Sequence, residues 1–327
     1  MSVRRSNTGI LDRVSAVVGN KIILLLFALI VGLFVLGEIV SSGFLAFDHV
    51  GAVLRTASFL GIVAIGQTIV ILTAGIDLSV GPLITMGNVF TCMFMNGLNE
   101  NTLWSLLAIV ALGALFGTLS GLGVTLLNIS PLVMTLAIGS LVTGVTLIFS
   151  HGAPKGLASP ILRYLAVGSV LGGIPIVVII WIVLGIFIII FLRFSTFGRK
   201  LYYVGANERA AFMSGVRVKR VKTIAYSISG ATACLTGALM AGYTHTAFLG
   251  IGNEYTLWSI TAVVIGGTAL TGGKGGYLGT MAGAVILVLL ESILTVMKMP
   301  EAGRRIATGV IILIMISIYF SRRMQRS

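Results

Sequence analysis

Charged residues are scarce in this sequence. They make up 9% of its 327 residues, and only nine residues are acidic, whereas a soluble domain carries about 25% charged residues. Hydrophobic residues make up 57% of the chain, which leaves too few polar side chains to cover a surface that faces water. The composition therefore excludes a water-soluble globular protein and indicates that lipid surrounds most of the chain.

Residues that usually carry chemistry are also few. Cys92 and Cys234 lie in separate apolar segments without C-x-x-C spacing, so we interpret them as packing residues. His49, His151 and His245 stand in three separate polar connections, and none has a second ligand at metal spacing. We therefore predict no metal, no cofactor and no catalytic site.

One glycine-rich segment, residues 272–275, resembles a nucleotide phosphate loop. That motif needs a further glycine where Thr268 stands and a serine or threonine where Gly275 stands. We therefore predict that the chain binds no ATP itself and that these glycines permit a tight turn. Similar glycine spacing follows both Thr73 and Thr271, an internal echo that is too short to establish a duplication.

Long apolar stretches dominate what remains, and about 20 such residues cross a membrane as a helix. The first stretch is too long for a signal peptide, so we interpret it as a retained helix. Glycines within the stretches, such as Gly113, Gly117 and Gly121, favour close helix packing. We predict an all-α integral membrane protein, with residues 1–327 forming a single polytopic domain. The ten expected spans are 22–40, 56–74, 79–96, 103–127, 131–149, 174–193, 223–243, 257–271, 277–297 and 305–321.

The net charge of +13 has two interpretations, a nucleic-acid partner or membrane topology. No basic run is interleaved with aromatic residues, which argues against nucleic acid. With the N-terminus inside, sixteen of the 22 Lys and Arg residues fall in cytoplasmic connections and six in outer ones. The positive-inside rule favours this orientation, and an even number of spans brings both termini to the cytoplasm.

The longest cytoplasmic connection, residues 194–222, contains signals for a short helix outside the membrane. Asn207 is a good N-cap, Glu208 suits the positive end of the helix dipole, and Gly215 can adopt the left-handed conformation that ends a helix. This helix either receives another protein's groove or rests on its own bundle. The residues expected to form this site are Gly205, Asn207, Glu208, Ala210, Ala211, Ser214 and Gly215, of which Ala210, Ala211 and Ser214 form a small face.

Two acidic residues in apolar surroundings also require an explanation. Asp77, or Ser79 beside it, caps the third span, or Asp77 helps to set a cytoplasmic gate or subunit contact. Glu291 lies inside the ninth span and faces a possible translocation pathway, or it reaches outer water from near a helix end. The sequence leaves both pairs of alternatives open.

Two segments carry a resemblance to a known family. The pattern Asn207-Glu208-x-Ala210-Ala211-x-x-x-Gly215 resembles the loop by which permeases of ATP-binding-cassette importers dock on their ATPase subunits. A second segment, Gly75-Ile76-Asp77-Leu78-Ser79-Val80-Gly81, is similar to one characteristic of the ribose, xylose and galactose permeases. The resemblance to that permease family runs from about residue 50 to the C-terminus. Arg209 departs from the general permease loop, where an acid would stand.

This resemblance implies a function and a set of partners. We expect the permease subunit of an importer that carries a monosaccharide or similar small polyol by alternating access, in the plasma membrane of a bacterium, which is the inner membrane of a Gram-negative host. The implied partners are a second permease chain, two cytoplasmic ATP-binding subunits, an extracytoplasmic sugar-binding protein and membrane lipid. The alternative is a secondary transporter or facilitator that works without an ATPase. Such proteins usually carry ionisable residues near the midplane, where this chain offers only Glu291.

Overall fold

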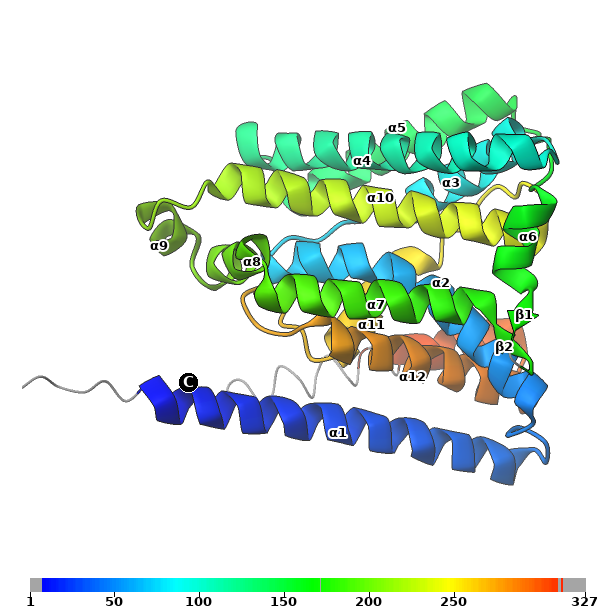
Figure 1. Ribbon diagram of the computed structural model, residues 1–327, viewed down its shortest axis with the longest axis horizontal. Helices are drawn as coiled ribbons and strands as arrows, with labels where there is room; N and C mark the ends of the chain where they lie inside the picture. The colour runs from blue at the N-terminus through cyan, green and yellow to red at the C-terminus, as the bar shows by residue number, and fades with distance from the viewer. Residues whose placement is uncertain (1–7, 171, 311–312, 314–327) are drawn as a thin grey trace, which may run out of the picture.

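A computed structural model describes residues 8–170, 172–310 and 313 of the chain, with side chains from residue 23 onward. The described part is almost entirely helical (Figure 1). Its long helices are α1 Thr8–Val40, α2 Phe47–Leu72, α4 Thr102–Leu126, α5 Pro131–Ser150, α7 Ile176–Phe194, α10 Val218–Thr244 and α12 Tyr277–Val296. Its shorter helices are α3 Val80–Met95, α6 Pro160–Val167, α8 Thr196–Ala206, α9 Glu208–Met213 and α11 Tyr255–Ile265, with a 3₁₀ turn at Asn99–Asn101.

Two small features complete the secondary structure. Strands β1 Ser169–Val170 and β2 Ile174–Pro175 form an antiparallel pair, in which Ser169 faces Pro175 and Val170 faces Ile174. A further helix covers residues 301–310. Proline and left-handed residues mark several helix ends. Pro131 and Pro160 begin α5 and α6, and Asn96 and His151 follow α3 and α5 with φ angles of 45° and 51°.

The prediction of a polytopic α-helical membrane protein is confirmed. Within the described residues, seven helices are long and apolar enough to cross a membrane. The first nine expected spans each coincide with a helix, although α1 begins much earlier than expected, at Thr8. The tenth expected span, 305–321, overlaps helix 301–310 and otherwise lies outside the described residues, as do both chain termini.

Two helices are too short to cross the membrane alone. With 16 residues in α3 and 11 in α11, they extend about 24 and about 16 Å, less than the hydrocarbon thickness of about 30 Å. Non-helical segments precede them, residues 73–79 before α3 and 245–254 before α11. The expected end of α11 at residue 271 is wrong because the helix stops at Gly266, and Gly267 then turns the chain with a φ of +84°.

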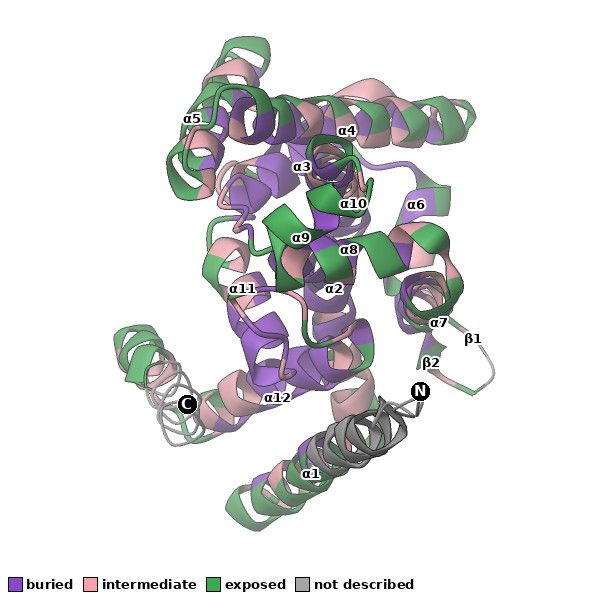
Figure 2. Cartoon of the chain, turned by 90° about the vertical axis from the view of Figure 1, so that its left-hand side faces the viewer, coloured by how far each residue is buried: buried purple, intermediate pink, exposed green. Residues whose placement is uncertain are grey.

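Helices α2 and α10 lie at the centre of the bundle, where Figure 2 shows the buried residues gathered. Glycines allow α10 to contact α4 backbone to backbone. A Cβ on Gly113 would overlap the carbonyl oxygen of Gly230, and one on Gly117 would overlap that of Tyr226. This packing confirms the close approach expected from glycines within spans, because such contacts hold helices together in lipid.

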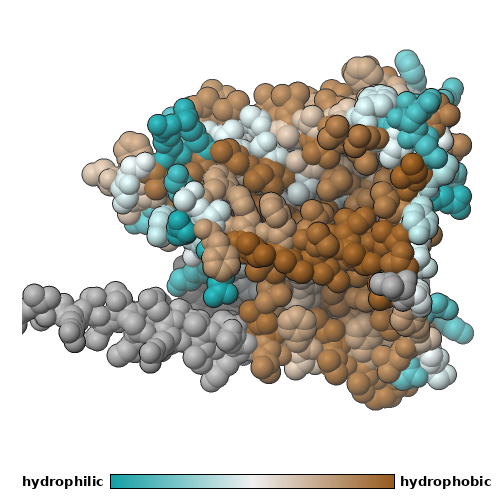
Figure 3. All heavy atoms as spheres, viewed as in Figure 1, coloured by the Kyte–Doolittle hydropathy of each residue, from teal (hydrophilic) through white to brown (hydrophobic). Residues whose placement is uncertain are grey.

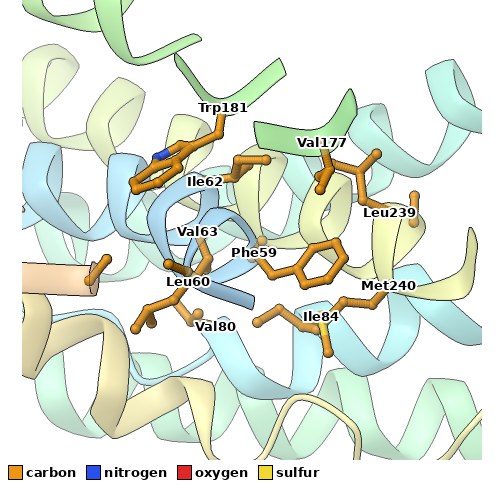
Figure 4. Packing of buried hydrophobic residues seen from close by; sticks show 14 of the residues in the cluster. Phe59, Leu60, Ile62, Val63, Val80, Ile84, Val177, Trp181, Leu239 and Met240 are labelled. Atoms are coloured by element: carbon orange, nitrogen blue, oxygen red, sulfur yellow. The ribbon is translucent and has the colours of Figure 1, made fainter. Parts of the chain in front are cut away.

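Aromatic and branched side chains fill the remaining space of the core (Figure 4). The indole of Trp181 on α7 covers α2, where Gly61 leaves room for it. The indole nitrogen of Trp181 donates a hydrogen bond to the Tyr277 hydroxyl over 2.8 Å, and that hydroxyl donates to the carbonyl of Gly61 over 2.7 Å. Helices α2, α7 and α12 are therefore joined through satisfied polar groups, as burial in an apolar core requires.

The outer surface has an apolar band between two polar ends (Figure 3). Helix α1 packs mainly against α12 and leaves large apolar side chains such as Leu24, Val31 and Ile39 exposed. Helices α4, α5 and α7 also expose leucine, isoleucine and phenylalanine. A lipid environment explains this surface, since exposing so many large apolar side chains to water is unfavourable.

The two polar ends differ in charge. We call the end that carries α8 and α9 the basic end, and the other the opposite end (Figure 1). Among the residues whose side chains are described, the basic end carries one acid, Glu208, and the basic residues Arg193, Arg199, Lys200, Arg209, Arg217, Lys219, Arg220, Lys222 and Lys274. The opposite end carries the acids Glu38, Asp48, Glu100, Glu254, Glu291 and Glu301 and the basic residues Arg55, Lys155, Arg163, Lys298, Arg304 and Arg305. The positive-inside rule assigns the basic end to the cytoplasm.

Candidate functional site

Two short helices, α8 and α9, lie at the basic end. Ser195 ends α7 and begins α8, and its hydroxyl accepts a hydrogen bond from the Gly198 amide over 2.8 Å. Asn207 separates α8 from α9, and its side-chain oxygen accepts from the Ala210 amide over 3.0 Å. Gly215 follows α9 with a φ of +81°. The predicted short helix is therefore present with the predicted caps.

Helix α9 buries one side and exposes the other. Ala211 is 4% exposed and packs in a cluster with Leu201 and Val218 of its own chain. Of the small face, Ala211 therefore rests on the bundle, whereas Ala210 and Ser214 are exposed, and docking of another protein on this face stays a prediction. Phe212 and Met213 are also exposed, at 68% and 79%. The exposed side of α9 therefore combines these two apolar side chains with the small residues Ala210 and Ser214.

A groove runs between α9 and the beginning of α10. It has a volume of about 590 Å³, and Phe212 forms part of its wall. Among the described residues that line it, Glu208 is the one acid, and it already forms an ion pair with Lys222. The other charged residues that line the groove are Arg209, Arg217, Lys219 and Arg220. The groove therefore combines an exposed aromatic ring with an excess of positive charge.

Beneath α8, three chain segments meet at their backbones. The Gly273 amide donates a hydrogen bond of 3.0 Å to the carbonyl of Leu72, the last residue of α2. A Cβ on Gly205 would overlap that carbonyl and lie 2.5 Å from the Gly273 nitrogen. A Cβ on Gly272 would lie 2.7 Å from the Ala74 nitrogen. We call this contact of Leu72–Ala74, Gly205–Ala206 and Gly272–Gly273 the glycine junction.

The glycine junction also brings together the two segments that have similar glycine spacing in the sequence. The two glycine-spaced turns, after α2 and after α11, lie directly against each other and against α8. Tyr202 of α8 adds a further tie, because its hydroxyl donates to the Gly275 carbonyl over 3.0 Å. Burial raises the pKa of Tyr202, which keeps the phenol neutral as a donor. If α8 moves, it therefore pushes directly on backbone atoms of both turns, because no flexible side chains lie between them.

The segment that continues from the junction holds the second set of expected residues. Asp77 is fully buried, and one carboxylate oxygen accepts from the Ser79 amide over 3.0 Å and from the Ser79 hydroxyl over 2.6 Å. This carboxylate thus forms a turn just before α3. The expected cap is not formed, because Ser79 stands at the N-cap position but its side chain makes no capping hydrogen bond. A role for Asp77 in a cytoplasmic gate or subunit contact stays a prediction.

Neighbouring helices hold this segment on both sides. The Leu78 amide donates to the Thr135 hydroxyl of α5 over 3.0 Å, and the Tyr226 hydroxyl of α10 donates to the Ile76 carbonyl over 3.4 Å. A Cβ on Gly75 would lie 2.5 Å from the Tyr226 hydroxyl. Gly81, in the first turn of α3, lies close to the carbonyl of Gly252. The residues from Gly75 to Gly81 therefore lie together between α5, α10 and the segment before α11, but apart from the exposed face of α9.

Glu291 lies far from both groups, at the opposite end. Its carboxylate pairs with Arg304 over 3.2 Å and accepts a longer hydrogen bond from Thr308 over 3.5 Å. Nearby, Arg305 pairs with Glu254 over 2.8 Å. These contacts tie α12 to helix 301–310 and favour the interpretation of Glu291 as a carboxyl near a helix end. A role for Glu291 on the pathway stays a prediction.

The comparison with known families gives a match over most of the chain. Residues 50–316 match the model of a family described as the permease component of the branched-chain amino acid transport system. The chain belongs to this permease family. The match includes the glycine junction, α8, α9 and the segment before α3, whereas α1 lies outside it. No solved structure matches the permease.

Individual relatives are similar over nearly their whole length. The permease is 34% identical to the ribose import permease protein RbsC of Bacillus subtilis over 292 residues, which cover 86% of this chain and 89% of the relative. It is 32% identical to RbsC of Escherichia coli strain K12, with 88% and 92% covered. It is 30% identical to the inner membrane ABC transporter permease protein YjfF of that strain, with 88% and 89% covered. The resemblance inferred from the two motifs is confirmed.

Sequence reasoning missed three parts of the site. It did not assign Gly272 and Gly273 to the same contact as Gly205, although two adjacent glycines outside a helix were visible as a signal. It regarded Phe212 only as an apolar contact and not as the centre of the exposed face. It did not identify Arg209, Arg217, Lys219 and Arg220 as residues that line one groove, because the turn after α9 determines which of these cations face α9.

Proposed function

We propose that this permease is the membrane-spanning subunit of an ATP-driven importer that carries a monosaccharide or similar small polyol into the cytoplasm. The names of two of the relatives support the substrate class, since both are ribose import permeases. The proposed partners are a second permease chain, two ATP-binding subunits at the basic end and a sugar-binding protein at the opposite end. ATP hydrolysis takes place in the partner subunits.

The observation that carries the proposal is the connection between α9 and the glycine junction. An ATP-binding subunit docks on Phe212 and Met213, and an acidic or polar segment of it enters the cationic groove. Helix α9 follows α8 with only Asn207 between them, so movement of the docked subunit displaces both helices. The carbonyl of Leu72 lies against Gly205, and the displacement therefore reaches the end of α2.

From Leu72 the movement continues into the membrane. Residues 73–79 lead directly to α3, and Thr135 and Tyr226 hold them against α5 and α10. ATP-driven closure of the partner subunits biases the bundle between an inward-open and an outward-open state, because the subunits bind the two states with different affinity. The same backbone contacts that make the junction stiff make it suitable to transmit this bias.

The experiment compares the intact system with and without its ATP-binding subunits. The permease is co-purified with the ATP-binding subunit of the importer and reconstituted into lipid vesicles with the sugar-binding protein. The proposal predicts a stable complex and ATP hydrolysis that is stimulated by sugar-loaded binding protein. It also predicts sugar uptake only when ATP is present on the side of the membrane that the basic end faces. Uptake of sugar by the permease alone, at the same rate, would instead establish a secondary transporter or facilitator.

A further inference from the structure

A non-helical segment descends into the membrane from the opposite end. Residues 245–254 leave α10 and follow α3, with the Phe248 amide donating to the Asn88 side chain over 2.8 Å and the Gly252 amide donating to the Thr85 hydroxyl over 3.2 Å. Thr85 lies ten residues before the end of α3 at Met95, which places it about 15 Å below that end. The segment therefore reaches well into the hydrocarbon region.

Non-helical backbone at this depth in the membrane requires an explanation. Lipid cannot hydrogen-bond to free backbone groups, so non-helical backbone occurs there only where protein buries it or where it lines a water-filled cavity. Asn253 is exposed, and its side-chain amide has no hydrogen-bond partner among the described residues. An unpaired amide in contact with lipid tails is costly. The exposed side of this segment therefore faces water or a polar solute.

A pocket lies where this segment, α3 and α5 meet. Its volume is about 160 Å³, and three threonines and Asn253 supply its polar lining. The Thr143 and Thr146 hydroxyls donate to the carbonyls one turn earlier on α5, over 2.9 and 2.8 Å, which leaves their oxygen lone pairs free to accept. Thr85 already both donates and accepts within the protein. Pro82 and Leu147 provide apolar walls.

The lining matches the chemistry of a sugar. Ring hydroxyls donate to threonine oxygens and exchange hydrogen bonds with the Asn253 amide, while the C–H faces of the ring contact Pro82 and Leu147. None of the described residues that line the pocket is charged. An uncharged lining suits a solute that must leave again, since conduction requires sites that bind weakly enough for release. We infer that this pocket is a contact site for sugar hydroxyl groups during passage through the permease.

The inference rests on the proposed function and connects the pocket to the glycine junction. Pro82 is in the first turn of α3, directly after the segment that begins at the junction. A Cβ on Gly139 of α5 would lie 3.3 Å from the Pro82 ring and 3.6 Å from the Ser79 Cα. Movement of residues 73–79 therefore shifts one wall of the pocket relative to α5.

The first test removes polar groups without changing shape. Thr143→Val and Asn253→Leu are introduced into the complete transporter, and uptake is measured with ribose, xylose and galactose in lipid vesicles. Thr118→Val is the matched control, because its hydroxyl makes the same bond to a carbonyl of its own helix on α4, outside the pocket. We expect at least a fivefold loss of sugar carried per ATP for both pocket variants, and parental values for the control.

The second test uses labelling and does not depend on transport. Asn253→Cys should react with a small, membrane-impermeant thiol reagent, and the transported sugar should protect it. Native Cys92 and Cys234 are buried, so they should contribute no labelling of their own. Val133→Cys, on an exposed apolar part of α5, should stay unlabelled.

The outcomes separate the two proposals. Parental uptake by both pocket variants, or labelling at residue 253 that no transported sugar reduces, would overturn the pocket assignment while the ATP-binding subunit stays bound. Failure of the ATP-binding subunit to associate with the unmodified permease, or transport of none of the three sugars by the complete system, would overturn the proposed function instead.

Discussion

The basic end and the opposite end of the permease are held together in different ways. At the basic end, α2, α8 and the turn before α12 meet through backbone atoms of glycines, while the cations on the surface have few acidic partners. At the opposite end, side-chain ion pairs such as Glu291–Arg304 and Glu254–Arg305 join the helices, and acids balance the cations. Backbone contacts are stiff, whereas exposed ion pairs are weak and screened by salt.

This difference indicates a division of roles. At the basic end, the stiff glycine junction below a cationic surface suits a role in receiving force from a charged partner. At the opposite end, the ion pairs only need to hold α12 and helix 301–310 together. Four predictions test whether the difference is functional, from the largest expected effect to the smallest.

The largest effect should come from filling the glycine junction. Gly273→Ala adds a Cβ about 2.7 Å from the Ala206 backbone and places a side chain at a φ of +71°. Left-handed strain costs about 1–2 kcal/mol, and overpacking adds about 1–3 kcal/mol. We expect loss of most uptake, measured per folded permease by size-exclusion chromatography and sugar transport.

A matched control separates strain from contact. Gly43→Ala, between α1 and α2, imposes the same kind of strain at a φ of +91°, but its added Cβ meets nothing within 4 Å. Uptake by this variant should stay near the parental level. Equal loss of uptake in both variants would remove the glycine junction from the account.

The next effect concerns the exposed face of α9. Phe212→Ala should weaken binding of the ATP-binding subunit about tenfold, because a buried phenylalanine contributes about 1.5–3 kcal/mol and tenfold in affinity corresponds to 1.4 kcal/mol. Phe187→Ala, which removes a similarly exposed ring from α7, is the control. Binding is measured by titration of the purified ATP-binding subunit into permease in nanodiscs. Equal affinities for the two variants would argue against docking on α9.

The cationic groove should make this association sensitive to salt. Arg220→Gln removes one of four groove cations, and electrostatic association weakens as the Debye length falls from about 8 Å at 0.15 M to about 3 Å at 1 M salt. We expect a several-fold lower association rate at low salt and a shallower salt dependence for the variant. Arg163→Gln at the opposite end should leave both quantities unchanged. A salt-independent rate for the unmodified permease would contradict the charge argument.

The smallest effect should follow from breaking the ion pair at the opposite end. Glu291→Gln keeps the shape and removes the charge that faces Arg304, a half-buried pair worth about 1 kcal/mol or less. We expect a small fall in Tm and unchanged uptake per folded permease, measured by thermal unfolding in detergent and by transport. A large loss of uptake at normal stability would place Glu291 on the translocation pathway.

Local signals made the helices and the α9 caps predictable. Asn207 and Gly215 act within a few residues of their own position, so their roles follow from the sequence around them. Apolar length located nine spans for the same reason, since lipid imposes it on each helix separately. The end of α11 was placed too late because Gly266 and Gly267 end the helix in the middle of an apolar run.

Contacts between distant segments were not predictable in this way. Ala211 faces the bundle because of the angle between α8 and α9, and no pattern within α9 reveals that angle. The junction joins Leu72, Gly205 and Gly273, which lie far apart in the chain. The descent of residues 245–254 beside α3 likewise depends on hydrogen bonds to Asn88 and Thr85. Helix packing decides such contacts, and a single sequence carries little trace of it.

The most direct test of the account is the amount of sugar carried per ATP hydrolysed by Gly205→Ala. The added methyl group would overlap the Leu72 carbonyl, while Phe212 and Met213 on α9 keep their exposure. The account predicts that this variant retains its ATP-binding subunits and their ATP hydrolysis but carries at least tenfold less sugar per ATP. A parental ratio of sugar to ATP in a complex that still contains Gly205→Ala would contradict transmission through the glycine junction.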